Sequence, residues 1–240
     1  MTVTAALEID RVSHSFGRVQ ALDQVSLVVP RGGFTALLGV NGAGKTTLFS
    51  LITRLYDNRS GHIRVAGHDL RQTPGAALAQ LGVVFQSRAL DADLTVAQNL
   101  TYHAALHGIP RQQALIRAAE VLAQVGLSER IHDPVSALSG GQSRRAEIAR
   151  ALIHRPRILL LDEATVGLDV KSRAEVLALT RDLTGQGVSV LWATHILDEI
   201  APGDGLVILH RGRVLAQGVT RDIAGGDLTG AFLRLTGGAA

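Results

Sequence analysis

The chain has 240 residues, of which 46% are hydrophobic and 3% aromatic, with a formal net charge of +3 and no cysteine. This composition predicts one large α/β domain with a sizeable aliphatic core. The missing cysteines exclude disulfides, thiolate metal sites and a cysteine nucleophile. No apolar run approaches the ~18 residues that a membrane-spanning helix needs, and residues 1–10 show no export signal. We therefore expect a soluble, cytoplasmic chain.

The basic residues are almost all arginines, because only Lys45 and Lys171 of the 24 Lys and Arg residues are lysines. One local group of arginines falls in a predicted helical stretch: Arg144, Arg145, Arg150, Arg155 and Arg157. Aromatic residues that could stack on bases are not interleaved with them. We therefore predict a solvated helix face rather than a nucleic-acid patch, and the charge selects no partner.

Short apolar runs bounded by turn residues predict strands. In chain order these are residues 7–15 and 21–29 around a turn at Gly17, then 34–39, 62–66, 81–85, 158–161, 188–193, 207–210 and 213–216. The last two form a hairpin around Arg211-Gly212. Helices are predicted over about 45–55 and 170–184, and over 140–154 behind the N-cap Ser139. This alternation predicts an α/β fold with a parallel-sheet core and right-handed crossovers.

The middle of the chain, residues 91–155, has helical periodicity instead. One apolar stripe runs from Leu94 to Leu106, and a second starts at Leu115. We therefore predict an inserted helical subdomain at about 87–155. The core would comprise about 1–86 and 156–240, within one domain of residues 1–240.

Residues 39–46, Gly-Val-Asn-Gly-Ala-Gly-Lys-Thr, match the pattern G-x-x-x-x-G-K-[ST] between an apolar strand and a helix. Glycines let successive backbone N–H groups curl around a phosphate, and the helix N-terminus adds its positive dipole end. Lys45 would neutralise β- and γ-phosphate charge, and the Thr46 hydroxyl would bind Mg²⁺. The candidate nucleotide-binding residues are Asn41, Gly42, Ala43, Gly44, Lys45, Thr46 and Thr47. The loop alone predicts a nucleotide but no particular chemistry.

A pair of acids, Asp162 and Glu163, directly follows the apolar run 158–161. In phosphate-loop NTPases an acid at such a strand end helps to hold Mg²⁺, a role that suits Asp162. Glu163 points the opposite way from the strand and could polarise the attacking water. Adjacent acids are usually only a solvated strand end, but behind a phosphate loop and at the end of a buried strand we assign Asp162 to Mg²⁺ binding and Glu163 to catalysis.

Residues 138–142, Leu-Ser-Gly-Gly-Gln, identify the class when they are combined with the two motifs above. Over nearly all its length the chain resembles the ATP-binding subunits of ABC transporters. The expected motifs follow in order: Phe16, the phosphate loop, Gln86, residues 138–142, Asp162-Glu163, Gly167-Leu168-Asp169 and Thr194-His195. The resemblance implies the ABC form of the phosphate-loop ATPase fold, with an N-terminal antiparallel β subdomain and an inserted α-helical subdomain.

The resemblance also implies roles within one copy of the chain. Phe16 would stack on adenine rather than serve as an ordinary strand-end aromatic. Gln86 would reach Mg²⁺ or the attacking water. His195 would bond the γ-phosphate and orient Glu163 rather than serve as a satisfied core histidine. The catalytic residues are then Glu163, His195 and Gln86, and the Mg²⁺ ligands are Thr46, Gln86 and Asp162.

Other motif residues would act on ATP held by a second copy of the chain. They are Ser139, Gly140, Gly141, Gln142 and Asp169. The resemblance thus implies a homodimer, or a pair with another ABC subunit, that closes on ATP and reopens after hydrolysis. Val40 and Ala164 stand where the family commonly has proline, and neither change removes a functional group.

Residues 226–237 are similar to the drug, polysaccharide and haem exporter branch of the family. Residues 47–56 and 191–195 are similar to ATPases encoded with quinoprotein (PQQ-dependent) alcohol dehydrogenase systems. The resemblance implies separate transmembrane permease subunits, with this chain peripheral at the cytoplasmic face of the cell membrane and no nucleic-acid partner. The alternative is a soluble non-transport ATPase that acts as a regulatory or nucleic-acid-associated switch. A phosphate-loop kinase would need an acceptor site that the sequence does not show.

Overall fold

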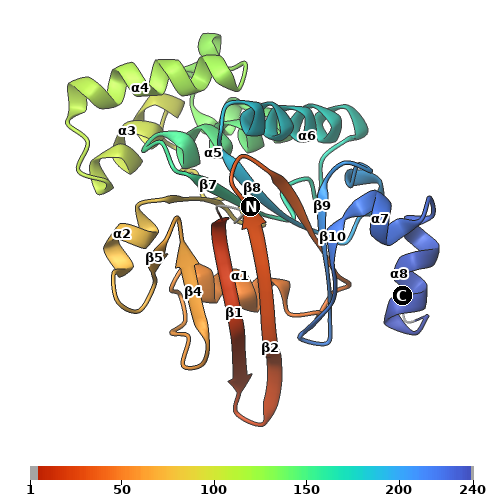
Figure 1. Cartoon of the computed structure of the whole chain (residues 1–240). Helices are drawn as coiled ribbons and strands as arrows, with labels where there is room; N and C mark the ends of the chain where they lie inside the picture. The colour runs from red at the N-terminus through yellow and green to blue at the C-terminus, as the bar shows by residue number, and fades with distance from the viewer. Residues whose placement is uncertain (1–4, 239–240) are drawn as a thin grey trace.

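The computed structural model describes residues 5–238, which fold around two β-sheets (Figure 1). The N-terminal sheet is antiparallel, with strand order β2-β1-β4-β5. The central sheet has the order β10-β9-β3-β8-β7-β6 and is parallel except for β10, which runs antiparallel to β9. The strands are β1 (Ala5–Phe16), β2 (Val19–Pro30), β3 (Phe34–Leu38), β4 (His62–Val65), β5 (His68–Asp69), β6 (Leu81–Val84), β7 (Ile158–Asp162), β8 (Ser189–Thr194), β9 (Gly205–His210) and β10 (Arg213–Val219).

The helices follow the sheet-forming segments in sequence. They are α1 (Lys45–Ile52), α2 (Pro74–Leu78), α3 (Val96–Leu106), α4 (Arg111–Gln124), α5 (Gly140–Leu152), α6 (Val170–Gly185), α7 (Thr220–Ala224) and α8 (Leu228–Thr236). Helices α3, α4 and α5 all lie between β6 and β7 in the chain, and Figure 1 shows α3 and α4 gathered at one end of the molecule. Within residues 5–238, no helix combines the length and apolarity needed to cross a membrane.

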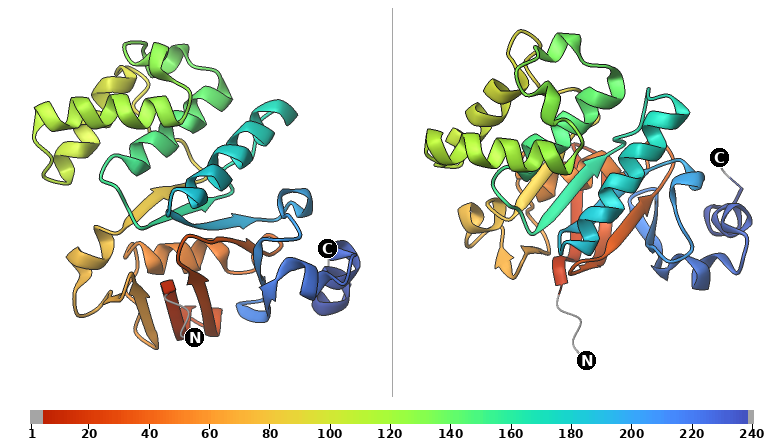
Figure 2. Two further views of the ribbon diagram at one scale, coloured as in Figure 1. Left: turned by 45° about the horizontal axis from the view of Figure 1, so that its top comes forward. Right: turned by 90° about the horizontal axis from the view of Figure 1, so that it is seen from above.

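Side chains of the central strands alternate between two hydrophobic cores, as the two-residue period of a strand requires. Leu37 and Leu160 pack with α1 and the N-terminal sheet. Ala36 and Leu161 face the opposite core, which is closed by helices α3 to α6. Helix α1 therefore lies between the two sheets, as the left view of Figure 2 shows. Burial on both faces explains why these strands read as continuous apolar runs.

The structure confirms the predicted fold class, with a largely parallel central sheet, an antiparallel N-terminal sheet and the helices that follow β6. Several boundaries differ from the prediction. Strands β1 and β2 have 12 residues each and are joined by a tight turn at Gly17, so they are not short. Helix α1 ends at Ile52, before the predicted residue 55. The short elements β5, α2, α7 and α8 were not predicted.

The apolar stripes predicted on the middle helices are wrong at two positions. Leu106 is 67% exposed and Leu115 is 44% exposed, whereas Val96 and Asn99 of α3 are buried. Leu106 is the last residue of α3. Leu115 lies beside the buried stripe of α4, which begins at Ala114 and continues at Ala118.

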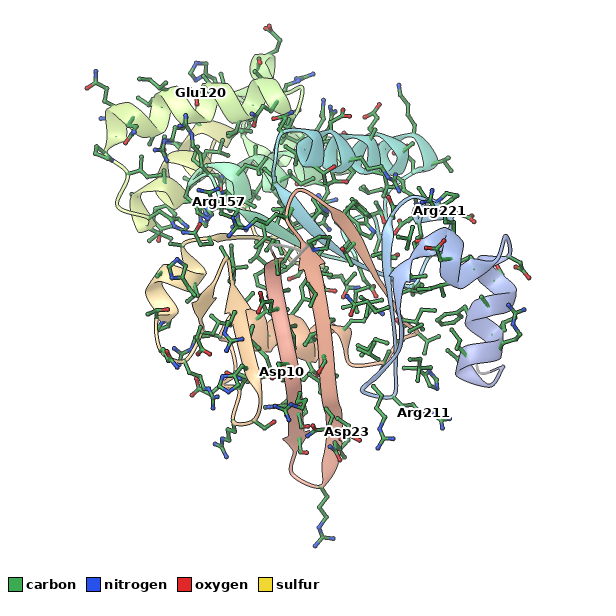
Figure 3. All side chains as sticks on the ribbon, in the orientation of Figure 1. Asp10, Asp23, Glu120, Arg157, Arg211 and Arg221 are labelled. Carbon is green, nitrogen blue, oxygen red and sulfur yellow. The ribbon has the colours of Figure 1, made fainter. Side chains whose placement is uncertain are left out.

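The prediction of a solvated arginine face is wrong for Arg144. Its side chain is 5% exposed, and Nη1 lies 2.6 Å from Glu147 Oε2 on the same helix. The same nitrogen donates to the carbonyl oxygen of Phe85 at 2.8 Å. Helix α5 packs beneath the segment after β6, which buries this face. Arg155 does fit the prediction, because it is 67% exposed in its pair with Glu120, which Figure 3 labels on α4.

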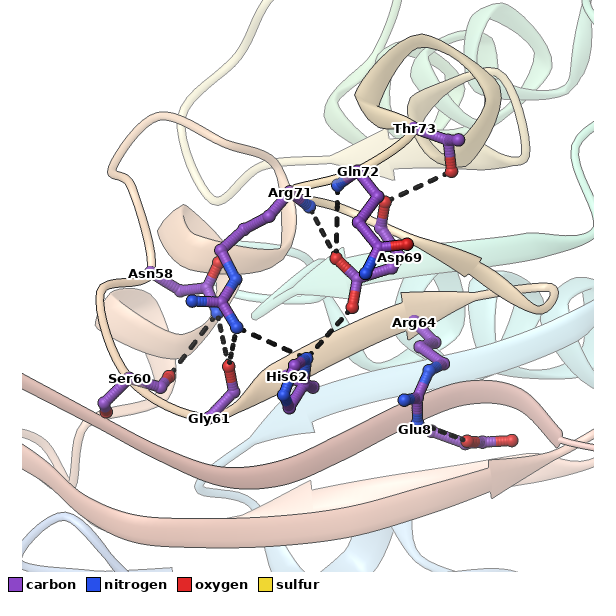
Figure 4. Close-up of polar contacts among 10 residues, drawn as sticks. All are labelled: Glu8, Asn58, Ser60, Gly61, His62, Arg64, Asp69, Arg71, Gln72 and Thr73. Carbon is purple, nitrogen blue, oxygen red and sulfur yellow. Dashed lines mark hydrogen bonds and ion pairs between the residues drawn. The ribbon is translucent and has the colours of Figure 1, made fainter.

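A polar network closes the β4–β5 hairpin (Figure 4). The Asp69 carboxylate accepts hydrogen bonds from the backbone N–H groups of Arg71 (2.8 Å) and Gln72 (3.3 Å) and lies 3.1 Å from His62 Nδ1. Burial alone would raise the pKa of Asp69, but these hydrogen bonds outweigh it and lower the pKa. Arg71 also donates to Gly61 O at 2.9 Å, so His62 is held within an occupied network.

Candidate active site

The phosphate-binding loop connects β3 to α1 and lines a cavity of ≈ 770 Å³. Gly44 has φ 109°, and a Cβ there would lie 2.8 Å from the carbonyl oxygen of Ala21, so both the backbone conformation and the space require glycine. The predicted loop residues that line the cavity are Asn41, Gly42, Ala43, Gly44, Lys45, Thr46 and Thr47. The N-terminal turn of α1 therefore faces the cavity, where its free N–H groups favour an anion.

Three residues from distant parts of the sequence meet at the same cavity because their strands are neighbours in the central sheet. Gln86 follows β6, Glu163 follows β7 and His195 follows β8, and all three line the cavity with the loop after β3. The carboxyl ends of adjacent parallel strands lie along one edge of a sheet. Strand order β3-β8-β7-β6 thus brings these side chains together.

Glu163 is at the centre of this group. Its Oε1 lies 3.3 Å from Lys45 Nζ and 3.2 Å from His195 Nδ1, and its Oε2 accepts a hydrogen bond from Gln86 Nε2 at 3.3 Å. Its backbone is left-handed, with φ 47°, which turns the chain sharply as it leaves β7. The side chain of His195 is 39% exposed, so it is not a buried core histidine. Its position beside Glu163 agrees with the predicted role, which stays a prediction.

The Lys45 side chain is buried, and its ammonium group is hydrogen-bonded. Its ammonium group donates to the carbonyl oxygen of Gly39 at 2.6 Å, and its side chain is only 5% exposed. A buried ammonium needs compensating negative charge, which the Glu163 carboxylate provides here. A phosphate at the loop would supply the same compensation.

Asp162 is the last residue of β7 and is 4% exposed, and it is not among the described residues that line the cavity. Burial raises the pKa of its carboxyl to about 6, and the neighbouring Glu163 carboxylate adds to this, while Lys45 opposes it. Its Oδ1 is buried without a hydrogen-bond partner among residues 5–238. A cation would relieve both the desolvation and the repulsion, and carboxylate and hydroxyl oxygens are the ligands that Mg²⁺ prefers. Asp162 and Thr46 therefore fit a Mg²⁺ site.

The Ser139–Gln142 motif forms the N-terminus of α5. None of its residues is among the described residues that line the cavity. Ser139 Oγ accepts from the Gln142 N–H at 3.2 Å, and the Gln142 side chain accepts from the Ser139 N–H at 2.9 Å, which is a capping box. A Cβ on Gly141 would lie 2.5 Å from Ser172 Oγ, so α5 and α6 approach closely here. The predicted N-cap role of Ser139 is confirmed.

Asp169 is the N-cap of α6 and is exposed close to this motif. Its carboxylate accepts from Ser172 N at 2.9 Å and from Ser172 Oγ at 2.7 Å. These hydrogen bonds lower the pKa of Asp169. Asp169, like the Ser139–Gln142 motif, is not among the described residues that line the phosphate-loop cavity.

Phe16 lies at the end of β1 and is 46% exposed. Its ring meets Tyr56 edge-on at 5.4 Å and His14 edge-on at 4.8 Å. In the described part of the chain it does not line the phosphate-loop cavity. An exposed aromatic ring beside a nucleotide-binding loop can still offer a face to a base.

Sequence reasoning missed several residues at this site, among them Val19, Gln20 and Ala21 of β2, which also line the cavity. Arg211 and Gly212 of the β9–β10 turn line the cavity, and Figure 3 shows Arg211 extending from that turn. Glu199 lies buried below the segments that carry the catalytic candidates. The Arg-Gly turn was a detectable signal, but its position next to the phosphate loop depends on β9 pairing with β3.

Comparison with known proteins agrees with this geometry. The family model described as ABC transporter matches residues 22–166. The chain is 35% identical to the linearmycin resistance ATP-binding protein LnrL of Bacillus subtilis (strain 168), over 92% of this chain and 72% of LnrL. It is 38% identical to the daunorubicin resistance ATP-binding protein DrrA3 of Streptomyces coeruleorubidus, over 97% of this chain and 75% of DrrA3.

A solved structure described as the ATP binding subunit of an ABC transporter superposes with a TM-score of 0.84. It is 29% identical and covers 96% of this chain and 99% of its own. The relatives support the exporter branch of the family, and the similarity to ATPases of quinoprotein alcohol dehydrogenase systems stays a prediction. The chain therefore belongs to the ABC transporter family, as an ATP-binding subunit with ATPase activity.

Proposed function

We propose that the chain hydrolyses ATP at the Glu163 cluster to drive export through separate permease subunits. The observation that carries this proposal is the contact of Glu163 with Lys45, His195 and Gln86 at the mouth of the phosphate loop. The drug-resistance names of LnrL and DrrA3 support export as the direction and a small organic compound as the cargo class.

In this mechanism the chain's residues mainly position groups and stabilise charge. The loop N–H groups and Lys45 hold the β- and γ-phosphates. Glu163 accepts a proton from the attacking water, and His195 keeps that carboxylate oriented while it faces the γ-phosphate. Mg²⁺ held by Thr46 and Asp162, with Gln86, would neutralise phosphate charge.

A second copy of the chain would complete the site. Ser139, Gly140, Gly141, Gln142 and Asp169 lie together at the N-terminal ends of α5 and α6, where Ser139 and Asp169 are exposed and Gly141 is buried. The helix N-terminus in this group offers N–H groups to an anion, yet this end lies apart from the phosphate-loop cavity of its own chain. Two copies arranged head to tail would place this end on the partner's ATP, with Phe16 against the adenine.

Membership of the family supports the partners and the location that we propose. We infer that the chain is a homodimer or pairs with another ABC subunit, and that it is held at the cytoplasmic face of the cell membrane by its permease. A nucleic-acid-associated switch is not favoured, because the arginine group that might have formed a basic patch includes the buried ion-paired Arg144.

The test is Glu163→Gln, with Glu129→Gln on an exposed 3-10 turn as the matched control. Glutamine keeps the side-chain size but cannot accept the proton. We expect phosphate release to fall about 10²–10⁴-fold, and size-exclusion chromatography to show a dimer only with ATP and Mg²⁺. The control should behave as the unmodified chain does. Persisting turnover in a chain that stays monomeric with ATP would remove both the Glu163 assignment and the dimer.

A further inference from the structure

Three histidines gather at a place separate from the ATP cavity. His103 and His107 lie at the end of α3, and His154 lies just beyond α5. One ring nitrogen from each residue lies within 4.8 Å of the others. The rings of His107 and His154 stack with centroids 3.8 Å apart and an angle of 4°, and His103 meets His107 edge-on at 5.0 Å. We call these residues the histidine triad.

The triad lines a cavity of ≈ 370 Å³ between α3, β6 and the end of α5. Its other lining side chains are mostly apolar, with Arg150 as the charged neighbour. The described residues around the phosphate-loop cavity include no member of the triad. A ligand at the triad would therefore occupy a site separate from that of ATP.

His154 has the hydrogen bonding of a typical metal-bound imidazole. Its Nε2 lies 2.8 Å from the carbonyl oxygen of Leu81, a contact that requires Nε2 to carry the proton and leaves the lone pair on Nδ1. This Nδ1 is buried with no partner in the part of the chain described. Metal-binding histidines commonly donate one N–H to a backbone carbonyl and coordinate through the other nitrogen.

His103 and His107 supply the other two imidazoles of the triad. They are four residues apart, with His103 in the last turn of α3 and His107 as its C-cap, and this spacing places two imidazoles on the same side for metal binding. Burial lowers the pKa of His103 and of His154 to about 4, and it also lowers the pKa of His107. Burial therefore favours the neutral form of each ring, which is the form that binds metal.

The neighbouring Arg150 opposes a cation, but its charge is partly offset. Its Nη1 donates to the carbonyl oxygen of Ala89 at 3.0 Å, and the carboxylate of Glu147 attracts its guanidinium. The stacked rings cannot share one ion as they lie, because the lone pair of an imidazole nitrogen lies in the plane of its ring, so the His107 ring must rotate out of the stack. His107 is exposed, so its side chain is free to rotate.

We propose that His103, His107 and His154 bind one divalent transition-metal ion of the Zn²⁺ type, which would link α3 to the end of α5. Three imidazoles without a carboxylate or thiolate favour Zn²⁺, Co²⁺, Ni²⁺ or Cu²⁺ over the oxygen-seeking Mg²⁺. A tetrahedral ion would keep one position for water or an outside ligand.

The experiment uses the full chain without a histidine tag, stripped with a chelator. Zn²⁺ is titrated by calorimetry in excess Mg²⁺, and Co²⁺ by its visible absorption. We expect one ion per chain and a higher melting temperature with Zn²⁺. His107→Ala, an exposed position, and His154→Gln, which keeps a donor for Leu81, should each weaken binding by at least about tenfold. Circular dichroism verifies that both variants fold.

His68→Ala is the control, since His68 is exposed on the β4–β5 hairpin and lies outside the triad. Its binding should match that of the unmodified chain. The same hairpin carries His62, which faces Asp69 (Figure 4) and could compete for Zn²⁺. The proposal is overturned if Zn²⁺ binding survives in both triad variants, if His68→Ala abolishes it, or if only weak binding to several sites is found.

Discussion

Glu199 holds together the two segments that carry the candidate catalytic residues. Its carboxyl group is 1% exposed and accepts three hydrogen bonds. Thr165 Oγ1, in the loop after β7, donates to Oε1. Trp192 Nε1 and Thr194 Oγ1, both on β8, donate to Oε2 at 3.0 Å and 2.5 Å. The loop after β7 and the end of β8 are thereby fixed to each other.

Replacing Glu199 by alanine would leave three buried donors without an acceptor. Each orphaned donor costs about 1–2 kcal/mol, so the free energy of unfolding should fall by about 3–6 kcal/mol. Glutamine should be far milder. Its amide oxygen can accept from Trp192 and Thr194, whereas its NH₂ group can only donate to the Thr165 hydroxyl, whose own proton then has no acceptor. One orphaned donor predicts a loss of about 1–2 kcal/mol.

The assay is urea unfolding followed by circular dichroism, with phosphate release measured on the folded variants. Asp198→Ala is the control, because Asp198 is exposed in the same 3-10 turn, and it should change stability by no more than about 0.5 kcal/mol. Glu199→Gln should keep most turnover. Equal stability for Glu199→Ala and Asp198→Ala would refute the argument, and so would a glutamine variant as unstable as the alanine variant.

Two further predictions concern buried ionisable groups. Arg144→Met should lower the free energy of unfolding by about 3–5 kcal/mol, because it leaves the buried Glu147 carboxylate without its ion-pair partner. Adding Glu147→Leu should recover most of that loss. A double variant no more stable than the single variant would contradict this prediction. Lowering the pH from 6.5 to about 4 should lower the free energy of unfolding. His103 and His154 have a pKa of about 4 in the folded chain, below the 6.5 of the free group. The unfolded state therefore binds more protons than the folded state over this range. Each histidine contributes up to about 1.4 kcal/mol per pH unit, and Asp162, with its pKa raised to about 6, offsets one of them. Urea midpoints across this range should fall less steeply in His154→Gln, and an unchanged slope would count against the shifted pKa.

Local sequence determined the parts of this protein that depend on near neighbours. The phosphate loop needs only its own glycines, the strand before it and the helix after it, so residues 39–47 were predictable. The capping box at Ser139 joins residues three apart, and the buried strands are recognisable as apolar runs. The fold class followed because few arrangements bury such strands and helices together. The order of the motifs then indicated the family.

Tertiary structure decided what depends on strand order and packing. The sequence does not state that β7 lies between β8 and β6, and that order is what places Glu163 beside His195 and Gln86. The burial of Arg144 depends on a carbonyl 59 residues away, so its helix looked like a solvated face. The histidine triad joins α3 to a position about 50 residues further along the chain. Such contacts join segments that are distant in the sequence. Bringing these segments together costs chain entropy, which only the packing of the whole core offsets. No local sequence pattern therefore predicts these contacts.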